Sequence, residues 1–91
     1  MYRIRFTKSS EKEWHKLDSA VRASLSKKLQ QAAKPESSRN RLRGFGGELF
    51  KLKLTSPQIR LVYRLADKES QLIVLAVGGR DVVYEKLHRR Q

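Results

Sequence analysis

Two lysines and one arginine have the types and spacing best suited to chemistry. Lys51 and Lys53 alternate with apolar residues in the segment Phe50-Lys-Leu-Lys-Leu54, and Arg60 follows the turn-forming pair Ser56-Pro57. Because side chains alternate between the faces of a strand, the two lysines share one face, and a hairpin about Ser56-Pro57 sets Lys53 opposite Arg60. Like charges across an antiparallel pair destabilise a sheet. This cluster therefore predicts an anion-binding function, and in so basic a protein the expected anion is a phosphate backbone.

Other residues extend this cationic set. Arg64 shares the face of Arg60, although an ion pair with Glu48 at the strand end would also explain it. Arg80 follows a glycine pair, and Tyr84 lies four residues later, so the two share one side of a helix. For Tyr84 a partly buried structural position and a functional position are both open.

Several alternative catalytic arrangements are not indicated. The chain has no cysteine, which excludes thiolate chemistry, disulfides and cysteine-based metal sites. His15 and His88 stand apart in the sequence, so a two-histidine nuclease is not expected, and the scattered acidic residues form no metal cluster. The segment Gly44-x-Gly-Gly47 lacks the ending of a phosphate-binding loop. We expect no metal and no cofactor.

The composition describes a small, strongly basic domain. The 91 residues suffice for one domain, spanning residues 1–91, and 21 Lys and Arg against 9 Asp and Glu give a net charge of +12. Polyanionic partners follow from this charge: nucleic acid, an anionic membrane or an acidic protein. No apolar run approaches the ~20 residues of a membrane span, and no secretory signal is evident. The lack of cysteine in so small a domain favours the cytoplasm.

The hydrophobic pattern predicts an α+β domain with the order β-α-α-β-β-β and a C-terminal helical segment, an antiparallel sheet packed by two helices. Strands are expected over residues 2–6, Leu49–Leu54, Ile59–Leu65 and Leu72–Val77, the last of them central. A first helix runs to about Leu17 and opens with a Ser10-x-x-Glu13 capping box. A second helix carries the stripe Val21, Leu25, Leu29 and Ala32. Residues 34–47 are expected to form a loop, and Asp81–Arg90 a final helix.

Taken in order, these segments resemble the RelE toxins of bacterial toxin–antitoxin pairs, within the RelE/ParE superfamily. The resemblance covers essentially the whole chain. It is carried by Lys12-Glu-Trp-His-Lys-Leu17, Leu42-Arg-Gly44, Phe50-Lys-Leu-Lys-Leu54, Arg60-Leu-Val-Tyr63 and Val77-Gly-Gly-Arg80, followed by Val83-Tyr84. It implies a microbial-ribonuclease-like fold and an endoribonuclease that cuts mRNA in the ribosomal A site.

Carried over by position, the implied active-site residues are Lys51, Lys53, Arg60, Arg80 and Tyr84. The spacing from Arg80 to Tyr84 is shorter than in the best-known relatives, and Gly79 replaces a histidine that some relatives have. Such an enzyme needs no metal if the RNA's own 2′-hydroxyl attacks the adjacent phosphate. The products are then a 2′,3′-cyclic phosphate, or its opened form, and a 5′-hydroxyl end.

Roles for these residues follow from the charge that develops on the phosphate. Clustered cations stabilise the transition state more than the ground state. Arg60 suits a bidentate clamp on phosphate oxygens. Either lysine could act as general base, because neighbouring cations disfavour its ammonium form, while the other stabilises charge. Arg80 would assist the leaving 5′-oxygen, and Tyr84 would stack on or orient a base, or position the 2′-hydroxyl.

Further basic residues are expected to meet the ribosomal RNA backbone, with solubility as the other explanation. They are Arg22, Lys27, Lys28, Arg39, Arg41 and Arg43. The resemblance also implies an acidic, partly disordered antitoxin that masks the cationic face and binds operator DNA. Two alternatives remain: a ParE-like inhibitor of DNA gyrase, or a binding module that acts mainly in the repressor complex. ParE-type relatives generally lack the full Lys/Arg set, which favours the ribonuclease.

Overall fold

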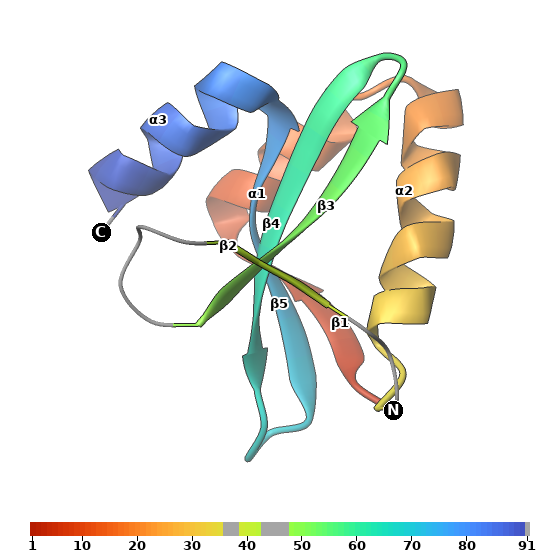
Figure 1. Ribbon diagram of the computed structural model, residues 1–91, viewed down its shortest axis with the longest axis vertical. Helices are drawn as coiled ribbons and strands as arrows, with labels where there is room; N and C mark the ends of the chain where they lie inside the picture. Colours follow the sequence, from red (N-terminus) through yellow and green to blue (C-terminus); the bar gives the residue numbers. More distant parts are fainter. Residues whose placement is uncertain (36–38, 43–47, 91) are drawn as a thin grey trace.

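The computed structural model describes residues 1–35, 39–42 and 48–90, with backbone only for residues 40–42 and 90. The elements are β1 (Arg3–Phe6), α1 (Lys8–His15), α2 (Ser19–Ala32), β2 (Asn40–Leu42), β3 (Leu49–Thr55), β4 (Gln58–Ala66), β5 (Gln71–Gly79) and α3 (Arg80–Arg90). The described strands form a five-stranded sheet in the order β1-β5-β4-β3-β2 (Figure 1). The predicted α+β class and the predicted order of the main elements are confirmed.

Two features of the sheet differ from the prediction. Strand β1 pairs with β5 in parallel, with Ile4 opposite Leu72, so the sheet is mixed rather than antiparallel. Hairpins fix the directions of β3, β4 and β5, whereas β1 reaches its neighbour only through tertiary packing, which the local pattern does not encode. Strand β2 lies inside the predicted loop and pairs with β3, with Asn40 opposite Lys51.

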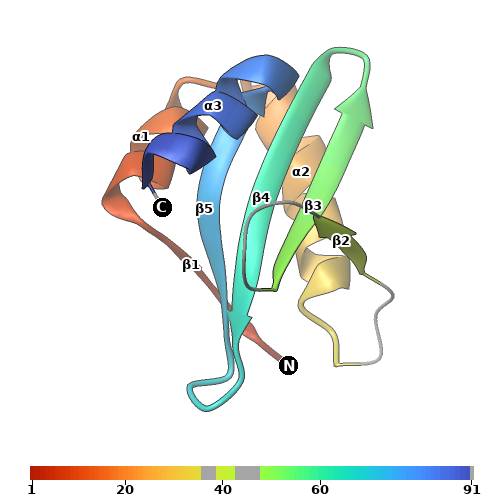
Figure 2. The ribbon, with the colours of Figure 1, turned by 60° about the vertical axis from the view of Figure 1, so that its left-hand side comes forward.

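The helices cover the two faces of the sheet unequally. Figure 2 shows α3 in front of the sheet and α2 behind it. On the face toward α2, hereafter the α2 face, the buried core contains Leu25, Leu29, Ala32, Ala33, Leu61, Tyr63, Leu72, Val74 and Val77. On the opposite face, hereafter the α3 face, a smaller buried cluster contains Leu49, Val62, Ala76, Val83 and Leu87. Strand β5 contributes to both clusters, which confirms that it is covered on both sides.

Helix α1 begins differently from the prediction. Its N-cap is Thr7, whose side chain accepts a hydrogen bond from the Ser10 backbone N–H at 3.1 Å. The predicted Ser10-x-x-Glu13 capping box is therefore wrong, because Ser10 already lies in the first turn. Ser10 is buried and donates its hydroxyl to the Val74 carbonyl at 2.7 Å. Helix α1 is thereby tied to β5 just where β1 ends, at the pair Phe6 and Val74.

Candidate active site

The predicted cationic cluster of Lys51, Lys53 and Arg60 forms on the α3 face. Lys53 pairs directly with Arg60 across β3 and β4, as predicted, and Lys51 pairs with Val62. Val62 belongs to the core on the α3 face, and Lys51 pairs with it. Lys53 and Arg60 are each two residues away along their strands, so their side chains lie on the same face. Neighbouring strands are about 4.8 Å apart, so the side chains of Lys53 and Arg60 leave the sheet side by side.

On its other side Arg60 has a glycine as its partner. Gly78 of β5 pairs with Arg60, so this row of the sheet has no third side chain. A register shift beside Val62 and Tyr63 creates this pairing. Without the shift, Arg60 would oppose Val77, and a valine side chain would stand beside the guanidinium. The bulge thus places a glycine rather than a valine next to Arg60.

Gly78 also directs the chain out of the sheet. Its φ of +156° is one that residues with a Cβ rarely adopt. A Cβ at Gly78 would meet Val83 Cγ2 at 3.6 Å, an ordinary contact, so the need for glycine is conformational. Two residues later Arg80 opens α3. The glycine therefore brings Arg80 to the same end of the sheet as the cationic cluster.

The Arg60 guanidinium is held by backbone carbonyls at the end of the β3–β4 hairpin. Its Nη1 donates to the Leu54 carbonyl at 3.3 Å and to the Ile59 carbonyl at 3.4 Å. Arg60 is half-buried, whereas Lys53 is exposed. Because a guanidinium has five N–H donors, these contacts orient the group and leave donors for a phosphate.

Arg80 and Tyr84 come from α3, which packs on the same face. Arg80 is exposed at the start of the helix. Tyr84 is half-buried and packs against the core cluster around Val62 and Val83. Tyr84 therefore occupies the partly buried structural position that was one of its two predicted alternatives. The exposed part of its side chain remains available at the surface.

Arg64 offers a contrast within the same strand. It pairs with Ile73 on β5, it is exposed, and it stands four residues from Arg60 on the same face. Within the residues that the structure describes, Arg64 forms no ion pair, so the predicted alternative of a pair with Glu48 is not found. Its row contains an isoleucine where that of Arg60 contains a glycine.

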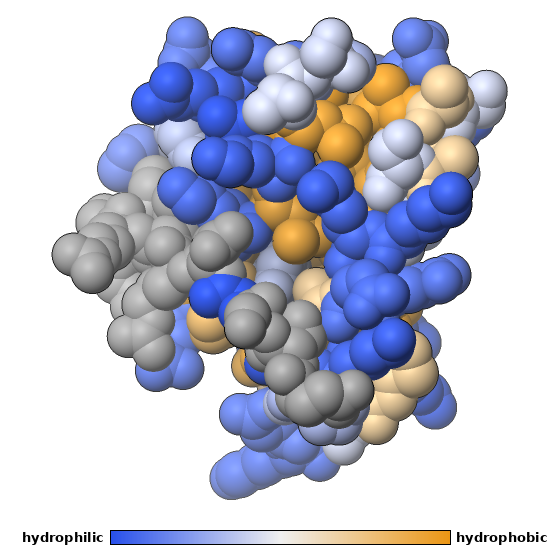
Figure 3. All heavy atoms as spheres, turned by 45° about the vertical axis from the view of Figure 1, so that its right-hand side comes forward, coloured by the Kyte–Doolittle hydropathy of each residue, from blue (hydrophilic) through white to orange (hydrophobic). Residues whose placement is uncertain are grey.

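The other predicted RNA-binding residues that the structure describes lie on elements outside the cationic cluster, although one of them shares a groove with Lys53. Lys27 and Lys28 are exposed on α2, across the sheet, and Arg22 of the same helix donates to the His15 carbonyl at 3.5 Å. Lys28 lines a groove of about 370 Å³ together with Leu52, Lys53, Leu54 and Thr55. Seen from this side of the molecule, apolar surface is exposed between hydrophilic side chains (Figure 3). Lys28 and Lys53 therefore line the same groove, although α2 lies across the sheet from the cluster.

Arg39 makes contacts within the protein. Its Nη2 donates to the Ala32 and Lys34 carbonyls at 3.0 and 2.8 Å, and its guanidinium lies 5.4 Å from the centre of the Tyr2 ring. The Arg41 side chain and Arg43 lie outside the described residues.

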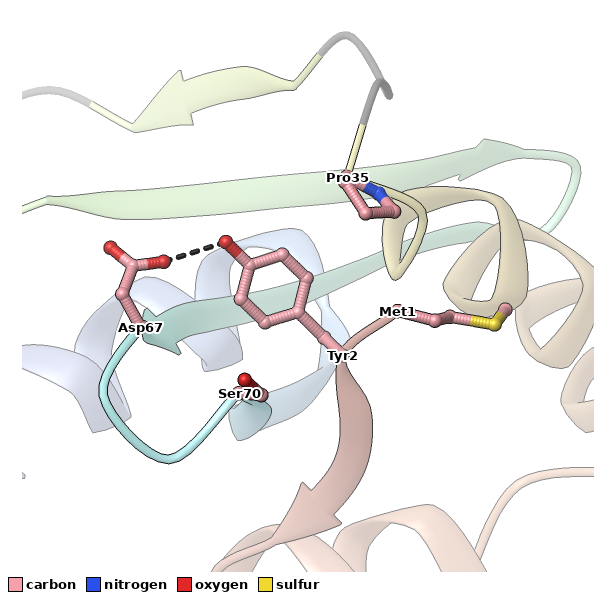
Figure 4. Close-up of a pocket in the computed structure, with 5 residues that line it drawn as sticks. All are labelled: Met1, Tyr2, Pro35, Asp67 and Ser70. Atoms are coloured by element: carbon pink, nitrogen blue, oxygen red, sulfur yellow. Dashed lines mark hydrogen bonds between the residues drawn. The ribbon is translucent and has the colours of Figure 1, made fainter.

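A second pocket, of about 180 Å³, lies at the opposite end of β5 (Figure 4). Its lining residues are Met1, Tyr2, Pro35, Asp67 and Ser70. The Tyr2 hydroxyl donates to Asp67 Oδ1 at 2.6 Å, and this hydrogen bond is the main cause of a raised pKa for Tyr2. None of the five candidate catalytic residues lines this pocket.

The buried carboxylate of Glu13 was predicted from the sequence to cap a helix, but it contacts β5 and α3 instead. Glu13 is only 8% exposed; its Oε1 accepts the Val77 N–H at 3.1 Å, and its Oε2 lies 2.8 Å from Lys86 Nζ. The available signal was its spacing, because Ser10 and Glu13 are three residues apart and so share the buried side of the helix. No group of three or more possible metal ligands occurs among the residues described, and no helix there is long and apolar enough to cross a membrane.

Comparisons with known proteins show the family and the fold of this chain. The family model described as "ParE toxin of type II toxin-antitoxin system, parDE" matches residues 4–84. The mRNA interferase toxin RelE of Escherichia coli (strain K12) is 40% identical over 81 residues, which are 88% of this chain and 84% of that protein. A putative RelE-like toxin protein of Escherichia coli is 36% identical over the same shares of the two chains. The toxin-like chain in the crystal structure of the intact E. coli RelBE toxin–antitoxin complex matches with a TM-score of 0.79 and 38% identity, covering 88% of this chain and 98% of that chain.

Proposed function

The chain belongs to the family of RelE and ParE toxins of type II toxin–antitoxin systems, and on this premise we propose that it is an mRNA interferase. It cleaves mRNA in the A site of the ribosome and so stops translation in the cytoplasm. The relative named mRNA interferase toxin RelE, at 40% identity, supports the activity. The observation that carries the proposal is the row formed by Lys53, Arg60 and Gly78: two cations lie side by side, and a glycine lies beside them.

The cleavage that we propose is a transfer within the RNA. The 2′-oxygen attacks the neighbouring phosphorus, and the bond from phosphorus to the 5′-oxygen breaks. The 2′-hydroxyl proton goes to a base, and a proton reaches the leaving 5′-oxygen. The products are a 2′,3′-cyclic phosphate and a 5′-hydroxyl end, and the cations take over the charge stabilisation that a metal ion would otherwise supply.

Each side chain has a role that fits its position. Arg60, oriented by two carbonyls, binds the phosphate oxygens through its remaining donors. Lys51 or Lys53 takes the 2′-hydroxyl proton, and the other lysine stabilises the charge on the phosphate. Arg80 approaches from the start of α3 and stabilises the leaving oxygen. Tyr84, partly anchored in the core, positions a base or the 2′-hydroxyl.

The partner of the resting toxin is an antitoxin. The matching E. coli structure is a toxin–antitoxin complex, and this chain's charge of +12 calls for an acidic partner. Such a protein would cover the cationic cluster and supply the contacts to operator DNA. The ribosome and its mRNA replace it when the toxin is released.

A second candidate function follows from the family model, which describes ParE toxins. A ParE-like protein would act on DNA gyrase. Its expression would induce a DNA-damage response and leave mRNA intact, whereas the ribonuclease would deplete mRNA and block translation.

The test is to map mRNA ends by primer extension after induction of wild type and of two variants. Wild type is expected to produce new ends within coding regions, and Arg60→Ala with Arg80→Ala to abolish them. Loss of one charge-stabilising donor typically costs about 10²–10³-fold in rate. Arg64→Ala is the matched control, because it removes the same charge from the same strand and face.

Three results would contradict the proposal. Cleavage that survives in the double variant would exclude Arg60 and Arg80 as catalytic residues. An equal loss in Arg64→Ala would show that total charge matters rather than the cluster. Intact mRNA with a DNA-damage response would support the gyrase alternative.

A further inference from the structure

The buried carboxylate of Glu13 contacts two residues, one that precedes Arg80 in the sequence and one that follows it. It accepts the N–H of Val77, which precedes Arg80 by three residues, at 3.1 Å. It also pairs with Lys86, which follows Arg80 by six residues, at 2.8 Å. One side chain from α1 therefore connects the end of β5 to the middle of α3.

The hydrogen bond from Val77 to Glu13 takes the place of one that a neighbouring strand would have made. Strand β1 pairs with β5 only from Gln71 to Val74, so beyond Val74 none of the described strands lies along this edge of β5. Helix α1 occupies that position, and Glu13 supplies the acceptor that a neighbouring strand would have supplied. A charged acceptor makes this hydrogen bond stronger than a neutral one.

The segment between the two anchors contains the two glycines that end β5 and lead into α3. Gly78 and Gly79 have no Cβ and lead directly to Arg80. Arg80 is exposed, so contacts around its side chain contribute little to its placement. Gly78 pairs with Arg60 in the sheet, so the position of Arg80 relative to Arg60 depends on this pairing and on the residues that hold both ends of the segment.

We propose that Glu13 is a positioning residue for the cleavage reaction, which acts by fixing the β5–α3 junction that presents Arg80 to the phosphate. This inference rests on the proposed ribonuclease function. Glu13 contacts neither RNA nor any reacting atom in this scheme. Its role is to hold Arg80 in place, and an error of about 1 Å in such a group can cost about 100-fold in rate.

The test is a double-mutant cycle between Glu13 and Arg80. Glu13→Gln keeps an acceptor for Val77 but removes the charge that attracts Lys86. In the wild-type background, the single-turnover rate of mRNA cleavage on saturating ribosomes is expected to fall about 10- to 100-fold, with the half-saturating concentration unchanged. In the Arg80→Ala background, Glu13→Gln is expected to have no further effect, because the group that it positions is gone.

Glu85→Gln is the matched control. Glu85 pairs with Arg89 on the exposed side of α3, so this variant also removes one ion pair and one negative charge from the helix. Cleavage by Glu85→Gln is expected to stay within twofold of the wild-type rate. Thermal unfolding of all variants gives the folded fraction, by which the rates are normalised.

Two outcomes would overturn the inference. If Glu13→Gln lowers the normalised rate by the same factor with and without Arg80, Glu13 does not act through Arg80. A measurement independent of cleavage is amide hydrogen exchange at Gly78, Gly79 and Arg80, which should quicken in Glu13→Gln but not in Glu85→Gln. Unchanged exchange would overturn the positioning role, whereas a wild-type protein that cleaves no mRNA would refute only the proposed function.

Discussion

Strand β4 shows the difference between the two faces of the sheet within nine residues. Toward the α2 face it presents Ile59, Leu61, Tyr63 and Leu65, all of them part of the core. Toward the α3 face it presents Arg60, Val62 and Arg64, of which only Val62 is buried. The α2 face is therefore the main source of hydrophobic stability, while the α3 face keeps cations together at some cost in stability.

This comparison predicts that changes on the α2 face alter stability far more than chemistry. Leu25 is fully buried, and Leu25→Ala is expected to lower the free energy of unfolding by about 2–5 kcal/mol. The folded fraction should keep the wild-type rate of cleavage, because Leu25 lies across the sheet from the cationic cluster. Thermal or urea unfolding, combined with cleavage rates normalised to folded protein, tests this.

The control for that variant is Gln30→Ala on the same helix. Gln30 is exposed, so its change should alter the free energy of unfolding by no more than about 0.5 kcal/mol. If normalised cleavage fell in Leu25→Ala but not in Gln30→Ala, the two faces would not be separable.

On the α3 face, removal of a cation is expected to lower the rate of cleavage but to raise the stability of the protein. Lys53→Gln should reduce cleavage about 100-fold or more, because it removes one cation from the phosphate site. The same change should raise the free energy of unfolding by about 0.2–1 kcal/mol, since Lys53 no longer opposes Arg60. Paired measurements of rate and unfolding on one protein preparation check both effects.

Arg64→Gln is the control for the stabilising part of that prediction. It removes a cation that opposes Ile73 rather than another cation, so little stability should be gained. A destabilised Lys53→Gln variant would mean that Lys53 contributes to packing, and that the cluster carries no cost in stability.

The pairing of Lys53 with Arg60 was predictable because it depends only on local features. Strand periodicity sets the face of each lysine, and the turn at Ser56-Pro57 sets the register of the hairpin, with Thr55 opposite Gln58. The helices were also predictable from their apolar stripes, and the buried Leu25 and Leu29 confirm the stripe of α2.

The features that shape the site depend on contacts between distant segments. The bulge that sets Arg60 opposite Gly78 arises from the pairing between β4 and β5. The residue types in the two strands do not predict its position. The parallel position of β1 has the same origin. Glu13 reads as a helix-capping residue until Val77 and Lys86, more than sixty residues away, are seen beside it.

The smallest expected effect concerns Tyr63, the ionisable side chain that the described residues bury in the core of the α2 face. Tyr63 is fully buried and stacks on Phe50, with ring centres 5.6 Å apart. Burial raises the pKa of Tyr63, and the nearby positive charge of Arg39 offsets part of this rise. The folded protein therefore holds the phenolic proton more tightly than the unfolded chain, whose tyrosine has a pKa of about 10.

The sign of the pH effect follows from this difference. Below about pH 10 the hydroxyl is neutral in both states, and the stability does not depend on it. Above that pH the unfolded chain loses the proton first, so wild type loses stability as the pH rises. Tyr63→Phe should lose less between pH 9.5 and 11, values chosen around the ordinary tyrosine pKa of about 10, in urea unfolding at fixed ionic strength. Tyr2→Phe is the comparison, because the pKa of Tyr2 is also raised, mainly by its hydrogen bond to Asp67, so this variant too should lose less stability at alkaline pH. Equal alkaline losses in wild type and Tyr63→Phe would show that the core of the α2 face admits the charged phenolate, and that its exclusion of charge is weaker than the contrast with the α3 face implies.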